Sequence, residues 1–188
     1  TYADGGKWGW WSDGGGSSLE LKDPNSDNRQ PANWADSDET QKAPWTLIER
    51  DALVELGMSS ATSNPDRLEL FLEGPGECLL DDIETRANGQ TNRVMNPGFE
   101  SGDATWFFQG THRRSFVESG VGRTGSALHV IAAERGDAGA NRIRTAIALM
   151  PTGTTNRGVI RAWGRWLRGE PNILLRLRGQ WMECAGKL

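Results

Sequence analysis

The sequence has few of the residues that most often carry chemistry. Its 188 residues include two cysteines, two histidines and one tyrosine. Cys78 and Cys184 form no Cys-x-x-Cys or Cys/His pattern, so a zinc or redox motif is excluded. Two buried free thiols are favoured over one long-range disulfide. No apolar run approaches the ~18 residues of a membrane-spanning helix, so we expect no membrane partner.

Little in the sequence points to catalysis. No phosphate-binding glycine motif occurs, and neither His112 nor His129 stands in a recognisable nucleophile setting. A glycosidase pair among the many carboxylates stays open, but the acidic residues 36–39 are more simply a solvated turn. We therefore expect a protein that is not an enzyme.

Charge is distributed unevenly along the chain. The whole chain carries a net charge of −4, but residues 1–94 carry −10 and residues 95–188 carry +6. Two parts of opposite sign either attract each other or form one acidic and one basic binding surface. Because the first part is acidic, we expect no nucleic-acid partner for the arginines of the second.

Short alternating segments with turn residues between them predict antiparallel strands. Residues 67–73 and 78–84 are joined by a Gly-Pro-Gly turn and are predicted to form a hairpin. The polar stretch 86–92 reads as a boundary between two units. The predicted fold is an all-β, antiparallel β-sandwich of jelly-roll character, with an acidic unit at residues 1–93 and a basic unit at residues 94–188.

Residues 159–167 and 173–182 are predicted to form a second hairpin. One face would set large against small apolar residues, with Trp166 opposite Leu175. The other face would set three pairs opposite each other: Arg165 and Arg176, Trp163 and Arg178, and Arg161 and Gln180. Like charges across a ladder need a partner, either acidic residues of the same chain or a ligand.

Residues 94–102 contain Asn-Pro-Gly-Phe-Glu and are followed by Trp106. This segment resembles the opening strand of a family 4/9-type carbohydrate-binding module, and residues 78–84 resemble the closing strand of that jelly-roll fold. Residues 139–145 and 165–179 are similar to a repeat region of large exported bacterial proteins with lamin-tail-like and spore-coat-kinase-like domains. Residues 13–24, with Asn33 and Trp34, resemble a lamin-tail-like domain.

The resemblance implies a secreted or cell-surface protein. Its first unit lacks an opening strand and its second a closing strand, so each is expected to be an incomplete module among other domains of a larger parent chain. A homodimer through unfinished sheets stays open. The resemblance also implies a structural calcium ion held by Glu100 and by Asp81 or Asp82.

Sugar recognition requires flat aromatic rings with polar side chains at their edges. Nine tryptophans against one tyrosine fit that requirement. We expect a non-catalytic module that binds polysaccharide, and an acidic one if the arginine face is open. The alternative is a structural spacer or adhesion module whose arginines dock on the acidic first unit. The predicted sugar-contacting residues are Trp10, Trp11, Asn33, Trp34, Arg161, Trp163, Arg165, Arg176, Arg178 and Gln180.

Overall fold

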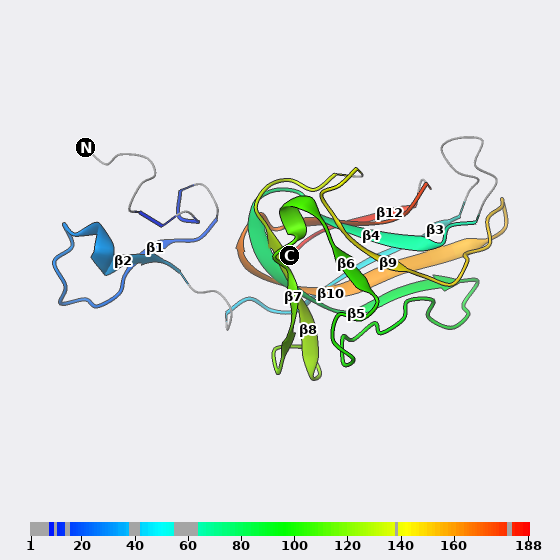
Figure 1. Ribbon diagram of the computed structural model, residues 1–188, viewed down its shortest axis with the longest axis horizontal. Coiled ribbons are helices and arrows are strands. Elements are labelled where there is room, and N and C mark those ends of the chain that lie inside the picture. The colour runs from blue at the N-terminus through cyan, green and yellow to red at the C-terminus, as the bar shows by residue number, and fades with distance from the viewer. Residues whose placement is uncertain are drawn as a thin grey trace.

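The computed structural model describes residues 8–9, 11–13, 16–37, 42–54, 64–137, 139–179 and 182–188. These residues form two antiparallel sheets of five strands each, stacked face to face, and a small two-stranded sheet beside them (Figure 1). The predicted all-β antiparallel β-sandwich is thereby confirmed. Among the described residues, no helix is long and apolar enough to cross a membrane.

The two sheets of the sandwich are called sheet I and sheet II. Sheet I contains, in spatial order, β3 (Thr46–Leu53), β10 (Arg157–Gly169), β5 (Gly76–Ala87), β8 (Ser126–Ala132) and β7 (Phe116–Ser119). Sheet II contains β12 (Glu183–Lys187), β11 (Asn172–Leu177), β4 (Arg67–Leu72), β9 (Ile143–Ala146) and β6 (Trp106–Phe108). The 3-10 helix η2 (Gly110–His112) precedes β7.

A smaller unit stands near the N-terminus. Strands β1 (Leu19–Leu21) and β2 (Trp34–Asp36) pair antiparallel, with the 3-10 helix η1 (Pro31–Asn33) between them. This unit lies outside the sandwich and adjoins one end of it (Figure 1). Trp11 makes one of the contacts between them, because its ring lies 5.6 Å from the guanidinium carbon of Arg168.

Two short connections carry the chain from one sheet to the other. Strand β4 leads into β5, and β10 leads into β11, yet each pair of consecutive strands lies in different sheets. Both predicted hairpins are therefore wrong. Pro75 and Pro171 favour these arches, since proline has no N–H to continue a ladder around a turn. The arches pack on each other, and the Glu170 backbone N donates to the Pro75 carbonyl at 2.9 Å.

The core lies between the two sheets. Leu68, Leu70 and Leu72 of β4 are buried in one cluster with Ile160 and Ala162 of β10, as the alternation along these strands predicted. Burial of each leucine stabilises the fold by about 1.5–3 kcal/mol. The side chains between them in sequence therefore lie on the outer faces of the sandwich.

The tryptophans follow this pattern less closely. Trp106 belongs to the main core cluster, whereas Trp45 packs half-buried against a small second cluster on the outer face of sheet I. Trp45, Trp166 and Trp181 alternate with apolar neighbours in the sequence, which predicts core positions for them. Trp166 is also only half-buried, so that prediction is wrong for Trp45 and Trp166. Trp181, expected in the core as well, lies outside the described residues.

Strands from both sides of residue 93 mix in both sheets. Sheet I joins β3 and β5 to β7, β8 and β10, and sheet II joins β4 to β6, β9, β11 and β12. The expected division into residues 1–93 and 94–188 therefore falls inside one sandwich. The polar stretch that predicted a boundary forms the end of β5 and the turn after it, where Asn88 and Gly89 adopt positive φ angles. Its composition marks a turn rather than a linker.

Candidate functional site

The structure separates the predicted sugar-contacting residues into three places. Arg161, Trp163 and Arg165 alternate with buried residues of β10 and so lie on the outer face of sheet I. Arg176 lies on the outer face of sheet II, and Arg178 directly follows the same strand. The predicted pairing of Arg165 with Arg176 is wrong, because β10 and β11 form an arch instead of a hairpin.

The remaining predicted residues belong to the N-terminal unit or are not described. The Trp34 indole N donates to the Asn28 carbonyl at 2.9 Å, and the Asn33 amide donates to the Asp27 carbonyl at 2.9 Å. These polar groups hold the β1–β2 loop. Trp11 packs near Arg168 at the end of the sandwich. Trp10 and Gln180 lie outside the described residues.

Trp163 is covered by an arginine of the neighbouring loop. The guanidinium carbon of Arg123 lies 3.9 Å from the centroid of the Trp163 ring, and Arg123 Nη1 pairs with Asp82 Oδ2 at 2.6 Å. Arg161 pairs with Glu84 at 2.6 Å. The ring that was predicted to stack on a sugar therefore already stacks on a guanidinium group within the chain.

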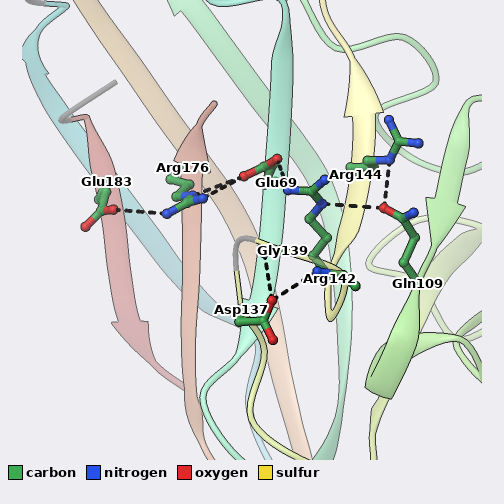
Figure 2. Close-up of polar contacts among 9 residues, drawn as sticks. Glu69, Gln109, Asp137, Gly139, Arg142, Arg144, Arg176 and Glu183 are labelled. Atoms are coloured by element: carbon green, nitrogen blue, oxygen red, sulfur yellow. Dashed lines mark hydrogen bonds and ion pairs between the residues drawn. The ribbon is translucent and has the colours of Figure 1, made fainter. Parts of the chain in front are cut away.

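The outer face of sheet II carries a cluster of five arginines around one buried glutamate. We call it the arginine face and define it by Arg67, Glu69, Phe107, Arg142, Arg144, Arg176 and Arg178. Strand pairing sets a row of residues directly opposite one another across all five strands, namely Glu183, Arg176, Glu69, Arg144 and Phe107. Figure 2 shows this row from β12 to β9, with Gln109 beside it.

Glu69 is the centre of the arginine face. Its side chain is fully buried, and its Oε1 accepts from Arg142 Nη1 at 2.7 Å. Its Oε2 accepts from Arg176 Nε at 3.1 Å and from Arg176 Nη2 at 3.0 Å (Figure 2). A carboxylate that lies between two guanidinium groups is well compensated, and it fixes the orientation of both arginines.

Arg144 has a different environment from Arg142 and Arg176. Its Nε donates to the Gln109 amide oxygen at 2.8 Å, and its guanidinium carbon lies 5.0 Å from the centroid of the Phe107 ring. Burial lowers the pKa of Arg144 from its ordinary value, and the charges of Arg67, Arg142 and Arg178 lower it further, although the Glu69 charge acts in the opposite direction. Positive charge therefore exceeds negative charge around this side chain.

The arginine face adjoins a cleft of about 470 Å³. Phe71 and Leu174 contribute its apolar surface, and Arg176 connects it to the central row. Two carboxylates also line it. Glu73 pairs with Arg135 at 3.0 Å, and Asp137 accepts hydrogen bonds from the loop at residues 139–141. The cleft itself is thus balanced in charge.

The residues predicted to hold calcium come together although they are far apart in sequence. Asp81 Oδ2 accepts from the Arg123 backbone N at 2.8 Å, and Glu100 Oε1 accepts from the Ser126 backbone N at 2.8 Å. Asp81 and Glu100 therefore hold the same connection between β7 and β8, Asp81 at its middle and Glu100 at the start of β8, and Asp82 reaches it through Arg123. Burial, with a contribution from the Asp82 charge, raises the pKa of Asp81.

Calcium prefers hard oxygen ligands, and this loop offers carboxylates of that kind. Among the described residues, no group of three His, Cys, Asp or Glu side chains is placed to hold a metal ion. Calcium also takes backbone carbonyl oxygens as ligands. The donor chemistry at Asp81, Asp82 and Glu100 fits calcium.

A second polar cluster lies on the outer face of sheet I. His129 Nδ1 lies 2.8 Å from Glu118 Oε2, and His129 Nε2 lies 3.2 Å from Glu77 Oε2. Arg168 Nη2 bridges both oxygens of Glu77 at 2.7 Å. Burial alone would lower the pKa of His129, but hydrogen bonds and charges from Glu77 and Glu118 raise it. The charged side chains of this cluster link four strands of sheet I, namely β5, β7, β8 and β10.

Sequence reasoning missed most of the arginine face. Arg67 and Glu69 alternate with three leucines of a predicted strand, and Arg142 and Arg144 flank Ile143, which is buried in β9. The sequence alone did not reveal that these strands are neighbours. Phe107 is 54% exposed beside Arg144, and only the structure shows this large exposed ring next to arginines.

Comparisons with known proteins give no relative for this chain. No protein-family model, no curated protein and no solved structure matches it. Its function must therefore be inferred from the residues and their arrangement.

Proposed function

We propose that this protein is a non-catalytic module that binds polysaccharide through the arginine face of sheet II. The observation that carries the proposal is Phe107, an aromatic ring with 54% exposure beside guanidinium groups of fixed orientation. An exposed ring can stack on the apolar face of a pyranose, and guanidinium and amide groups can donate to its hydroxyls. The adjoining cleft offers further contact area.

The proposed site lies on sheet II, whereas Trp163, the ring predicted to bind sugar, lies on sheet I. Trp163 was expected to stack on the sugar, but the guanidinium carbon of Arg123 lies 3.9 Å from its ring centroid and Trp163 is only half-exposed. That of Arg144, by contrast, lies 5.0 Å from the Phe107 centroid and leaves that ring 54% exposed. Arg176 and Arg178 stay in the proposed site, where Arg67, Arg142 and Arg144 join them. The resemblance of residues 94–102 to a carbohydrate-binding module supports the same class of function. It also supports export to the cell surface or beyond, as part of a larger parent chain.

Binding to insoluble polysaccharides tests this function. In a sedimentation assay with a panel of neutral and acidic polymers, we expect at least one polymer to retain the protein. Phe107→Ala should weaken that retention about tenfold, because it removes the stacking ring from an exposed position. Phe116→Ala is the matched control, since Phe116 is 42% exposed on sheet I. Equal losses in both variants, or no retention by any polymer, would contradict the proposal.

We further propose that calcium stabilises the loop between β7 and β8. Asp81, Asp82 and Glu100 would supply carboxylate oxygens, and the ion would act on stability rather than on the sugar site. Thermal unfolding should shift upward in millimolar calcium chloride relative to excess chelator, and Glu100→Gln should abolish the shift. A melting temperature that does not respond to calcium would refute this assignment.

A structural spacer is the second candidate function. Arginines of the second half pair with glutamates of the first half, as in Arg161 with Glu84 and Arg168 with Glu77. Such pairs favour the view that the charge asymmetry serves docking within the chain. The spacer and the binding module differ in one result, which is whether Phe107→Ala changes retention on any polysaccharide.

A further inference from the structure

We infer that the polysaccharide bound by the arginine face is a polyuronate, a polymer whose sugar rings carry carboxylate groups. This inference rests on the proposed function and names its substrate class. It is carried by the charge balance of the face, by the geometry of Arg144 and by the position of Phe107.

The charge balance of the arginine face is positive. Five arginines surround one buried glutamate, and Glu69 already binds two of them. Within the described part of the chain, no ion pair joins an acidic group to Arg67, Arg144 or Arg178. Glu183 is the nearest further acid of the row, but it lies on the edge strand β12 at 4.0 Å from Arg176.

These three arginines lie close together. The Arg178 backbone N donates to the Arg67 carbonyl at 3.0 Å, which places Arg67 and Arg178 side by side on neighbouring strands. Arg144 lies on the other side of β4, opposite Glu69. The three guanidinium groups lie on neighbouring strands or directly beyond their ends, and among these described residues none forms an ion pair with Glu69, so together they favour an anion at this point of the face.

The guanidinium group of Arg144 has an orientation in which it can bind a carboxylate. Gln109 accepts from its Nε and also lies 3.4 Å from the Nε of Arg142, so one amide fixes the approach of both side chains (Figure 2). The terminal nitrogens of Arg144 have no acidic partner among the described residues. A planar guanidinium group can give two parallel hydrogen bonds to a carboxylate, and an orientation fixed in advance lowers the cost of binding.

The position of Phe107 selects a carboxylate that is attached to a sugar ring. Phe107 lies directly opposite Arg144 across the β6–β9 pair, and the guanidinium carbon lies 5.0 Å from the ring centroid. A pyranose that stacks on Phe107 would therefore place a carboxylate on its own ring within reach of Arg144. A neutral sugar in the same place would offer the guanidinium group of Arg144 no anion to pair with.

The two carboxylates of the cleft do not oppose this orientation. Glu73 is neutralised by Arg135, and Asp137 is turned toward its own loop, where it accepts from the Gly139 and Ala140 backbone N atoms. Both lie on the Phe71 side of the central row, away from Arg67 and Arg178. The polymer would thus follow Arg178, Arg67 and Arg144 toward Phe107.

Affinity electrophoresis with polygalacturonate and with its fully methyl-esterified form tests the inference. The two polymers share a backbone and differ in the carboxylate charge. We expect retardation by the acid form, weakened by added salt, and about tenfold weaker binding in Arg144→Gln, since a hydrogen bond to a charged group is lost. Arg157→Gln, which alters an arginine on sheet I paired with Asp51, is the control and should bind as the parent does.

Some outcomes would contradict only the polyuronate assignment, and others would also contradict polysaccharide binding. Equal retardation by the ester and the acid would overturn the polyuronate assignment and leave polysaccharide binding intact. Retardation by dextran sulfate or nucleic acid, but not by polygalacturonate, would also overturn it. Retention by none of the polymers would overturn both proposals. If Arg144→Gln fails to fold by circular dichroism, Arg178→Gln replaces it, because Arg178 is exposed and follows the end of β11.

Discussion

Replacement of Glu69 by glutamine perturbs the centre of the arginine face with almost no change in shape. The substitution keeps the size of the side chain and removes one negative charge. Arg142 and Arg176 then face each other across a neutral amide. In the parent protein, the carboxylate accepts three charge-assisted hydrogen bonds, at 2.7, 3.1 and 3.0 Å.

The size of the effect follows from the burial of the three groups. Removal of one partner from a buried ion pair typically costs about 3–5 kcal/mol. Glu69 is fully buried, but the side chains of Arg142 and Arg176 retain 14% and 22% exposure, so water partly solvates the charges left behind. We therefore expect Glu69→Gln to lower the free energy of unfolding by about 3 kcal/mol. The melting temperature should fall by roughly 6–12 °C.

Urea unfolding followed by tryptophan fluorescence measures this loss. Glu183→Gln is the control, because Glu183 is 46% exposed and 4.0 Å from Arg176, and it should cost less than about 0.5 kcal/mol. Glu69→Gln combined with Arg176→Gln should cost less than the sum of the single changes, since the two residues contact each other. A loss below about 1 kcal/mol for Glu69→Gln would refute the view that this carboxylate organises the face.

Three further predictions concern titratable groups. Because the pKa of His129 is raised, its contribution to stability is fully present below pH 6.5 and is lost as the pH rises through its folded-state pKa. His129→Gln should remove that part of the pH dependence in urea unfolding, and an NMR titration of His129 with a midpoint below 6.5 would contradict it. Burial lowers the pKa of His112 to about 4, and its Nε2 accepts from the Leu72 backbone N at 3.0 Å. Its contribution, roughly 3 kcal/mol, should be present above pH 6.5 and disappear as the pH falls toward 4, a loss that His112→Gln should not show. Cys78 and Cys184 are buried and free, and burial raises the pKa of both thiols, that of Cys184 to about 11. Neither should react with a thiol reagent until the protein unfolds, and fast labelling of the native protein would show that the core is open.

The sequence predicted individual strands better than their partners. The alternation of Leu68, Leu70 and Leu72 identified one buried face correctly, because the two-residue period of a strand is a local property. The sheet in which a strand lies depends on the path of the chain after the turn. Pro75 and Pro171 stand in two connections that look like hairpin turns, yet both carry the chain into the opposite sheet.

The same limit explains what was predicted of the site. The sequence correctly indicated that arginines of the second half would need negative partners. Arg176 pairs with Glu69, Arg168 with Glu77 and Arg161 with Glu84. It could not place Arg144 beside Phe107, because their pairing depends on contacts between β6 and β9. It also could not reveal that Arg123 covers Trp163, since this contact comes from a loop.

The position of the ligand is measured most directly by NMR, with the arginine Nε–Hε and aromatic signals followed as oligogalacturonate is added. The account predicts that signals of Arg144 and Phe107 shift together and saturate at the same ligand concentration, while those of Arg123 and Trp163 stay in place. Shifts centred on Trp163 and Arg123, with Arg144 unaffected, would place the site on sheet I and contradict the account.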